Sequence, residues 1–407
     1  MEPLRDRHVL VGVSGSISAY KACELVRELR AAGATVRVLP TKSAQAFVTP
    51  LTFEALSGMP CLTDALQMAE GRIPHVEEAY RADLFVVCPA SADVMAKMAH
   101  GFADEALLST LLSYTGPLVV APAMETHMWE HPATQANLVA LQARGARVVG
   151  PDEGPLASGR SGRGRLAPVA RVVEACREAV SEPDLAGRHV LVTAGPTVED
   201  VDPVRYLTNR SSGKMGAALA RVAHRRGARV TLVHGPLEVP VPEGDQLTAV
   251  PVRSAEDMHR AVMAAVDTGD VDAAILCAAV ADYRPAAVAE RKLKKERGEL
   301  TAIPLAKNPD ILRDLGARSA RPFLVGFAAE TDDVEANARE KLTRKRADVI
   351  AANDVSRADS GFGADTNRVV LLFQDGREEH LAPMPKDDVA GHILDAVRAG
   401  LSSRSGS

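Results

Sequence analysis

The chain has 407 residues, of which 46% are hydrophobic and 25% charged, and its formal net charge is -5. This length exceeds one typical core and predicts two domains of an ordinary globular protein. The charge argues against a nucleic-acid-binding surface. No apolar run reaches the roughly 18 residues that a membrane-spanning helix needs, and the N-terminus lacks an apolar signal segment. We therefore expect a cytoplasmic protein that binds neither nucleic acid nor membrane.

The segment RHVLV occurs twice, at Arg7–Val11 and at Arg188–Val192, and each copy is followed by a glycine-containing loop. After the first copy, the sequence predicts a helix over 19–33 and strands over 35–41, 83–90, 117–123 and 144–151. After the second copy, it predicts a helix over 214–227 and strands over 228–236, 272–279, 322–330 and 347–354. Continuous apolar strands that alternate with helices are typical of parallel sheets with helices on both faces.

The predicted fold class is therefore α/β, with two tandem Rossmann-like three-layer domains. We place the domains at 1–183 and 184–407, because the segment SEPDLAGR between them is polar and contains proline. The last six residues, SSRSGS, have the composition of a disordered terminus. The five cysteines form no C-x-x-C pair, so they predict neither a zinc site nor a disulfide framework. The sequence assigns no ligands to a metal.

The first glycine loop, VGVSGSISAYK, lacks the G-x-G-x-x-G fingerprint of dinucleotide-binding proteins. Gly15 and Ser16 precede the first helix, and the next strand ends at Thr41, which is a hydroxyl rather than the carboxylate that binds a ribose. Backbone N–H groups at a helix start, together with small hydroxyls, favour a phosphate. The loop therefore indicates a mononucleotide such as FMN, although a tight turn without ligand explains it equally well when it is taken alone.

The second glycine loop, VTAGPTVEDVDPVRYLTNRSSGKMG, lacks the G-x-x-x-x-G-K-[ST] pattern of Walker nucleotide-binding proteins. It combines a helix N-terminus and a lysine with Arg205 and Asn209, a set that suits a phosphorylated or acyl-phosphate compound. Further along, Lys341 and Lys345 share one helix face, where like charges repel unless an anion neutralises them. A solvated helix face explains this pair when it is taken alone. Alongside the segment AKNPD, a triphosphate is the better explanation.

Four motifs of the first half, GVSGSISAYK, PHVEEA, CPASADVMAKMAHG and APAMETHMW, occur in the order found in flavin-containing cysteine decarboxylases. The chain as a whole resembles the bacterial bifunctional proteins of coenzyme A biosynthesis, in which a phosphopantothenoylcysteine decarboxylase is fused to a phosphopantothenate–cysteine ligase. The resemblance covers nearly all of Arg7–Ala399. It implies a flavodoxin-like first domain with FMN, and a second domain with the ligase fold.

For the first domain, the resemblance implies that the flavin oxidises the substrate's cysteine thiol, so that the carboxylate leaves as CO2 before the flavin reduces the product. His75 would act as the base or proton handler, and Met124 and Glu125 would contact the substrate. The residues implied to surround FMN are Gly15, Ser16, Thr41, Ser91 and Asp93.

Two residues depart from the pattern of the decarboxylases. Many relatives have asparagine where this chain has Glu125, and a carboxylate there repels the substrate carboxylate unless it is turned away, protonated or compensated by His127. Ser158 stands where many relatives carry a cysteine that donates the final proton from a glycine-rich flap. An alcohol is a far poorer acid, so either another group supplies this proton or the decarboxylase is impaired. The flap also carries cations that suit a substrate phosphate or carboxylate, namely Arg160, Arg163 and Arg165.

For the second domain, the resemblance implies that CTP activates 4'-phosphopantothenate as an acyl-cytidylate, which cysteine then attacks to release CMP. Mg2+ would balance the charge of the triphosphate. Arg205 and Asn209 would hold the acyl-cytidylate, and Lys292 would serve the condensation. The residues implied to hold CTP are Ala279, Asp282, Lys292, Ala306, Lys307, Asn308, Pro309, Phe327, Lys341 and Lys345. The residues themselves do not distinguish CTP from ATP.

A bifunctional enzyme is the leading interpretation of the sequence. The alternative is a ligase whose flavin domain serves as an oligomerisation or regulatory module. A nicotinamide dehydrogenase is disfavoured by the missing fingerprint and ribose carboxylate. The resemblance also implies a homo-oligomer in which ligase domains form dimers and decarboxylase domains form trimers, which together close into a dodecamer.

Overall fold

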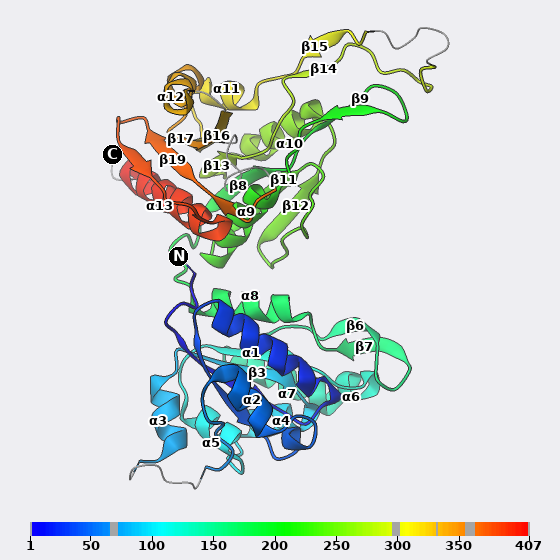
Figure 1. The fold of residues 1–407 in the computed structure, drawn as a ribbon, viewed down its shortest axis with the longest axis vertical. Helices are drawn as coiled ribbons and strands as arrows, with labels where there is room; N and C mark the ends of the chain where they lie inside the picture. Colours follow the sequence, from blue (N-terminus) through cyan, green and yellow to red (C-terminus); the bar gives the residue numbers. More distant parts are fainter. Residues whose placement is uncertain (1, 66–71, 295–301, 331–332, 355–362, 406–407) are drawn as a thin grey trace. The chain divides into compact units, whose positions relative to one another are not determined.

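The computed structural model describes residues 2–65, 72–294, 302–330, 333–354 and 363–405 (Figure 1). The chain divides into two compact units, Glu2–Ser181 and Glu182–Ser407. Each unit is described by itself. Within the described ranges, no helix is both long and apolar enough to cross a membrane.

The first unit contains a five-stranded sheet in the order β2-β1-β3-β4-β5, and all of its strand pairs are parallel. Its strands are β1 (His8–Val13), β2 (Thr35–Pro40), β3 (Leu84–Ala90), β4 (Leu118–Pro122) and β5 (Arg147–Val148). One face packs on α1 (Lys21–Ala31), α2 (Pro50–Ser57) and α8 (Val169–Val180). The other face packs on α4 (Ala92–His100), α5 (Ala106–Ser113) and α7 (Pro132–Ala143). Val9 and Val11 enter the first of these cores and Leu10 the second, because alternate strand residues point to opposite faces.

The second unit contains an eight-stranded sheet in the order β12-β11-β8-β13-β16-β17-β19-β20. The strands are β8 (His189–Ala194), β11 (Arg229–His234), β12 (Leu247–Pro251), β13 (Ala273–Leu276), β16 (Phe323–Glu330), β17 (Val349–Asp354), β19 (Val369–Phe373) and β20 (Glu378–His380). Helices α9 (Lys214–Arg225) and α13 (Lys386–Ser405) cover one face. Helices α10 (Ala255–Asp267), α11 (Ile311–Gly316) and α12 (Val334–Lys345) cover the other.

Three small antiparallel pairs complete the second unit. They are β9 (Val198–Asp200) with β10 (Tyr206–Thr208), β14 (Tyr283–Pro285) with β15 (Leu305–Lys307), and β18 (Thr366–Asn367) with β21 (Met384–Pro385). Figure 1 shows β9, β14 and β15 projecting beyond the edge of the large sheet.

The predicted α/β architecture with two three-layer domains is confirmed, but two details were wrong. The second sheet is not wholly parallel, since β19 runs antiparallel to both β17 and β20. The signal for this hairpin was the dipeptide Asp375–Gly376, a typical hairpin turn. The terminal SSRSGS was expected to be disordered, but α13 continues to Ser405. Its serine hydroxyls are satisfied inside the helix, because Ser402 and Ser403 donate to the carbonyls four residues earlier, at 3.0 and 2.7 Å.

The repeated RHVLV segment makes the same contacts in both units. In the first, the His8 N–H donates to the Asp83 carboxylate at 2.8 Å, and Arg7 donates to the other oxygen of the same carboxylate at 2.9 Å. In the second, the His189 N–H and Arg188 bind the two oxygens of Asp272 at 2.8 and 3.1 Å. Each aspartate directly precedes the next strand in the sheet, β3 or β13. The Arg-His pair therefore aligns the start of its own strand with the start of the neighbouring strand.

We expect Glu78→Gln to lower the free energy of unfolding of the first unit by about 3 kcal/mol, the low end for breaking a buried ion pair. Glu78 is 2% exposed and binds His8 Nε2 at 2.8 Å and Arg37 Nη1 at 2.7 Å. The loss of its charge leaves the half-buried Arg37 without this counter-charge. Denaturant titration measures the change. The matched control is Glu77→Gln, which breaks only the more exposed pair with Arg72 at 3.5 Å, and we expect it to cost less than about 0.5 kcal/mol.

The same carboxylate predicts a loss of stability in acid. Burial raises the pKa of Glu78, but the hydrogen bond from His8 and the charge of Arg37 lower it further, so that the net pKa lies below its ordinary value. A pKa lowered by folding adds stability above the unfolded-state pKa of about 4.3, and this stability is lost as the pH falls below it. We therefore expect a steeper acid-side slope of the unfolding free energy in wild type than in Glu78→Gln. Equal slopes would remove Glu78 from the acid transition.

Candidate active sites

The residues predicted around FMN lie in loops at the carboxyl ends of three adjacent strands. Gly15 and Ser16 follow β1, Thr41 follows β2, and Ser91 and Asp93 follow β3. Because β2, β1 and β3 are neighbours in a parallel sheet, these loops meet at one edge, where ligands of open α/β sheets bind. The structure thus brings these five residues to one end of the first sheet.

Ser14, which was not among the predicted site residues, joins two of these loops. Its side chain is fully buried. The hydroxyl donates to the Pro89 carbonyl at 2.7 Å and accepts from the Ser91 N–H at 2.8 Å. The sequence feature that could have identified Ser14 is its small hydroxyl side chain directly before Gly15.

Gly15 is required where the loop after β1 meets the loop after β2. A Cβ at this position would lie 2.5 Å from the Cβ of Ser43, so only glycine lets the two loops touch. The Thr41 side chain is 3% exposed, and its hydroxyl accepts from the Ala44 N–H at 3.1 Å. Ser16 and Ser91 are half-exposed at the starts of the following helical segments, where they accept from the N–H groups of Ser18 and Val94. This close-packed, hydroxyl-lined edge fits a phosphate.

His75 lies at the start of α3 (Pro74–Arg81) and is half-buried. Its Nδ1 lies 3.0 Å from the Ala65 carbonyl oxygen. A carbonyl only accepts, so Nδ1 carries the proton, and Nε2 bears the lone pair of the neutral ring. The contact at Nδ1 therefore leaves Nε2 as the nitrogen that can accept a proton. Among the described residues, no hydrogen bond or ion pair joins His75 to the loops after β1, β2 and β3.

Glu125 is the N-cap of the short helix α6 (Thr126–Glu130), and its Oε2 accepts from the His127 N–H at 2.7 Å. This carboxylate oxygen is thus engaged by the first turn of its own helix. An asparagine carbonyl would accept the same N–H. The departure at Glu125 therefore preserves the local backbone but adds a negative charge.

The glycine-rich flap is a hairpin of β6 (Asp152–Pro155) and β7 (Ser161–Arg165) that packs on the segment carrying Glu125. The Met124 N–H donates to the Gly164 carbonyl at 3.0 Å. Any side chain at Gly162 or Gly164 would collide with Thr126 or Met124. Arg163 lies over the Trp129 ring at 5.9 Å. Ser158 is exposed at the turn of this hairpin, where the Leu156 N–H donates to the Arg160 carbonyl at 2.8 Å.

In the second unit, Asn209 meets the loop that follows β13. Its amide donates to the Ala279 carbonyl at 2.8 Å, across 70 residues of chain. Ala279 also bridges to Pro196 in the loop after β8, the strand next to β13. Thr197, which the sequence analysis missed, is fully buried there and accepts the Ala281 N–H at 3.0 Å. Two predicted residues and the second glycine loop thus converge at the carboxyl ends of adjacent strands.

The segment Ala306–Pro309 lies against Asp282. The Asn308 N–H donates to the Asp282 carbonyl at 2.9 Å, and the Asn308 amide donates to the Ala281 carbonyl at 2.8 Å. Arg284 donates to the Asn308 side-chain oxygen at 3.1 Å. These contacts join two parts of the predicted CTP site that are separate in the sequence.

Lys341 and Lys345 both lie on α12, but they contact different elements. Lys341 donates to the Phe327 carbonyl in β16 at 2.8 Å. Lys345 forms an ion pair with Asp310, the N-cap of α11. Burial raises the pKa of Asp310, but Lys345 and the Arg313 N–H lower it further, so its pKa lies below the ordinary value. Lys345 would have to exchange this carboxylate for a triphosphate.

Lys292 is exposed in the segment that follows β14. Its neighbour Leu293 is held by Arg205, whose Nη2 donates to the Leu293 carbonyl at 2.5 Å. The two residues predicted to act on the acyl-cytidylate and in the condensation are thereby connected through one backbone carbonyl.

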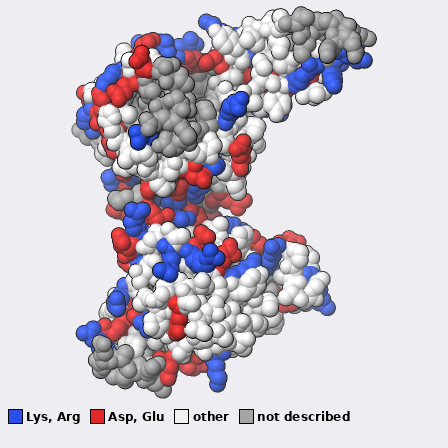
Figure 2. All heavy atoms as spheres, in the orientation of Figure 1, with Lys and Arg blue, Asp and Glu red and all other residues white. Residues whose placement is uncertain are grey.

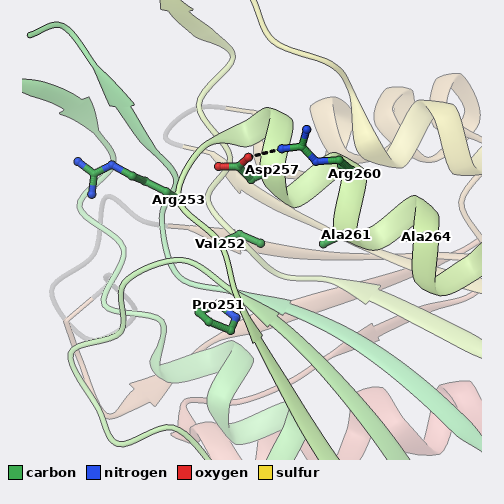
Figure 3. Close-up of a pocket in the computed structure, with 7 residues that line it drawn as sticks. All are labelled: Pro251, Val252, Arg253, Asp257, Arg260, Ala261 and Ala264. Carbon is green, nitrogen blue, oxygen red and sulfur yellow. Dashed lines mark hydrogen bonds and ion pairs between the residues drawn. The ribbon is translucent and has the colours of Figure 1, made fainter. Parts of the chain in front are cut away.

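A hollow in the second unit lies elsewhere, at the end of β12 and along α10 (Figure 3). It has a volume of about 480 Å³, and none of its seven lining residues is a predicted site residue. Figure 3 shows Asp257 paired with Arg260 on α10, while Arg253 points away from them. Arg253 instead binds Asp200 at 2.6 and 2.9 Å. The charges around this hollow are already paired within the protein.

On the face shown in Figure 2, basic and acidic side chains are interspersed over each unit. Among the described residues, no group of three or more His, Cys, Asp or Glu side chains is placed to hold a metal ion. The polar groups most suited to ligand binding are therefore those at the carboxyl ends of the two sheets.

Fold and site together define a two-domain α/β protein with a glycine-containing loop after the first strand of each domain. Residues 1–181 match the family model described as "Flavoprotein", and residues 185–401 match that of the "DNA/pantothenate metabolism flavoprotein C-terminal domain". The chain is 46% identical to the coenzyme A biosynthesis bifunctional protein CoaBC of Bacillus subtilis (strain 168), over 99% of both chains. It is 44% identical to the protein of the same name from Escherichia coli (strain K12), over 96% of both.

The chain belongs to the family of CoaBC bifunctional proteins of coenzyme A biosynthesis. A crystal structure of the C-terminal domain of a CoaBC protein is 40% identical to this chain, of which it covers 55%, and is itself covered completely, with a TM-score of 0.46.

Proposed function

We propose that this chain catalyses two successive steps of coenzyme A synthesis. Residues 184–407 ligate 4'-phosphopantothenate to cysteine with CTP, and residues 1–183 decarboxylate the resulting 4'-phosphopantothenoylcysteine to 4'-phosphopantetheine with FMN. The proposal rests on the near full-length relationship to CoaBC proteins, which includes both domains.

In the ligation, an oxygen of the substrate carboxylate attacks the α-phosphorus of CTP, and pyrophosphate leaves. The cysteine amine then attacks the acyl carbon, which forms the amide and releases CMP. Arg205 and Asn209 hold the acyl-cytidylate, and Lys292 stabilises the charge that develops during the condensation. Asn209 is supported in this role by its contact with Ala279, which places its amide at the carboxyl end of β13. The proposed CTP-binding residues are Ala279, Asp282, Lys292, Ala306, Lys307, Asn308, Pro309, Phe327, Lys341 and Lys345.

Mg2+ enters this proposal as the counter-cation of the triphosphate. The described residues provide no carboxylate cluster for a resident ion. We therefore expect the metal to bind as its complex with the triphosphate.

The edge formed by Gly15, Ser16, Thr41, Ser91 and Asp93 is the proposed FMN site. The close approach at Gly15 and the hydroxyls around it fit the flavin phosphate. Bound flavin supplies reversible two-electron oxidation at the carbon that bears the substrate thiol, which makes loss of the neighbouring carboxylate as CO2 easy. His75 takes a proton through Nε2, since its Nδ1 is engaged by the Ala65 carbonyl. Met124 and Glu125 contact the substrate. The positive charges of the flap arginines complement its anionic groups.

Product analysis with 4'-phosphopantothenate, cysteine, CTP and Mg2+ tests both activities in one experiment. Phosphopantetheine and CO2 as end products would establish the bifunctional enzyme. Accumulation of phosphopantothenoylcysteine would favour the second candidate, a ligase whose flavin domain serves oligomerisation or regulation. The exposed Ser158 at the flap turn is the observation that keeps this candidate open.

We expect Ser158→Cys to accelerate the final reduction by about tenfold or more if proton donation from the flap limits the rate, because general acid catalysis contributes 10²–10⁴-fold. The turn is exposed, so the substitution should not disturb the core. Stopped-flow measurement of flavin reoxidation and product formation reports the effect. The matched control is Ser161→Cys at the start of β7. An unchanged rate in Ser158→Cys would mean that another group already supplies the proton.

We also propose that the chain forms a homo-oligomer in the cytoplasm, with dimers of the ligase domain and trimers of the decarboxylase domain that together form a dodecamer. Light scattering of the purified protein tests this assembly.

A further inference from the structure

The segment Ala289–Leu293, which carries Lys292, is attached at both ends to the turn Val201–Arg205. At one end, the Ala289 N–H donates to the Val201 carbonyl at 3.0 Å. At the other end, the Leu293 N–H donates to Asp202 Oδ2 at 3.1 Å, and the Leu293 carbonyl accepts from Arg205. The exposed Lys292 therefore stands on a backbone that is held on either side of it.

Asp202 is the centre of this attachment. The residue is 2% exposed. Its Oδ1 accepts the N–H groups of Val204 and Arg205 at 2.8 and 2.9 Å, and its Oδ2 accepts the Leu293 N–H and Arg205 Nε, each at 3.1 Å. Burial raises the pKa of Asp202, but these N–H donors and the charge of Arg205 lower it further, so its pKa is below the ordinary value. The carboxylate is thus ionised and can accept from every one of its neighbours.

We propose that Asp202 is a positioning residue for the ligation, because it holds the backbone of Leu293 and so fixes where Lys292 meets the acyl-cytidylate. This inference rests on the proposed function of the second domain. Nothing in the sequence pattern marks Asp202, because its role follows from a contact across 91 residues of chain. Small displacements of a catalytic group cost about 10²-fold in rate, so a single backbone hydrogen bond can matter at this place.

The test compares Asp202→Asn with Asp200→Asn. Asparagine at 202 keeps the shape but replaces one acceptor oxygen with an NH2 group. In either orientation of the amide, two of the four N–H donors lose their acceptor, so the attachment of Leu293 to the turn is weakened. Asp200 lies two residues earlier in β9 and binds only the exposed Arg253 side chain, at 2.6 and 2.9 Å, so its substitution applies the same chemical change without touching the Lys292 segment. Single-turnover assays follow pyrophosphate release and CMP release separately, and hydrogen exchange by mass spectrometry follows residues 289–293.

We expect Asp202→Asn to slow CMP release at least tenfold while pyrophosphate release changes much less, and to speed hydrogen exchange in 289–293. Asp200→Asn should match wild type in all three measurements. A general folding defect would slow both releases. A second pair of variants leaves Asp202 itself unchanged. Leu293→Pro removes the N–H that Asp202 accepts, and its ring also restricts the backbone of residue 293 and of the preceding Lys292, whereas Leu293→Ala retains the N–H. We expect Leu293→Pro to slow CMP release as Asp202→Asn does. We expect Leu293→Ala to release CMP at the wild-type rate.

Three results would overturn the inference. The first is CMP release in Asp202→Asn as fast as in Asp200→Asn. The second is slowed CMP release with unchanged exchange in 289–293, which would show that Asp202 does not act by holding the segment. The third is equal CMP release in Leu293→Pro and Leu293→Ala. A wild-type chain that forms no phosphopantothenoylcysteine would instead overturn the proposed function itself. The catalytic part of this inference would fail with it, whereas the hydrogen exchange of residues 289–293 would still test whether Asp202 holds the segment.

Discussion

Replacement of Lys292 by glutamine is expected to lower the rate of phosphopantothenoylcysteine formation by about 100-fold or more, the usual cost of removing one preorganised donor from a transition state. Glutamine retains a hydrogen-bond donor but loses the positive charge that opposes the developing negative charge. The segment around Lys292 is fixed by Asp202 and Arg205, so its neighbours cannot easily move to replace it. The measurement is the steady-state rate of CMP release with saturating CTP and cysteine.

Arg291→Gln is the matched control for this prediction, because it removes one positive charge from the adjacent exposed position. We expect Arg291→Gln to keep the wild-type rate within about threefold, since an exposed charge is screened by solvent. The flavin content of Lys292→Gln, read from visible absorbance, should be that of wild type, because its site lies in the other unit. Ligation at the wild-type rate by Lys292→Gln would remove this residue from the reaction.

Replacement of His75 by asparagine is expected to lower the rate of CO2 release from phosphopantothenoylcysteine by about 100-fold or more, because a positioned base contributes 10²–10⁴-fold. The amide of the introduced asparagine can still donate to the Ala65 carbonyl, but the variant has no basic nitrogen equivalent to Nε2. Nε2 is the proposed base, since Nδ1 lies 3.0 Å from a carbonyl that can only accept. Capture of labelled CO2 from the carboxyl-labelled substrate measures the loss.

Ligation provides the internal reference for His75→Asn, because it takes place in the other unit and should proceed at the wild-type rate. His100→Asn, at the exposed end of α4, applies the same substitution outside the proposed site and should decarboxylate normally. If both histidine variants released CO2 like wild type, the assignment of His75 would fail. If His75→Asn lost its flavin, the histidine would instead have to be assigned to cofactor retention.

The sequence predicted those elements whose signal is local. Each long buried strand is a continuous apolar run, so β2, β3, β16 and β17 were expected within one or two residues of their bounds. The hairpin of β19 and β20 was missed because antiparallel pairing depends on the chain direction of a neighbour rather than on composition. The helical C-terminus was missed because its serines look polar in sequence, whereas Leu401 beside them is buried in the core.

The candidate sites divide in the same way. Motif order led to the predictions for Gly15, Asn209 and Lys292, because each of them lies in a short contiguous motif of the chain. The sequence did not reveal that Glu125 caps its own helix by accepting the His127 N–H, because a cap depends on the local backbone geometry. The pairing of Lys345 with Asp310 was not expected, because it joins two helices that are distant in sequence.

By itself, the sequence determined the fold class, the presence of two nucleotide-type halves and the family, because apolar runs and motif spacing are properties of short stretches of chain. The sequence also showed that the RHVLV segment is repeated, but it did not show which contacts the two copies make. Only the tertiary structure decided that each copy binds an aspartate before the neighbouring strand, that Ser14 joins two loops, and that Asp202 holds the backbone beside Lys292. These are hydrogen bonds between groups that are 75 to 91 residues apart, and a pattern read along the chain does not contain the folding that brings such groups together.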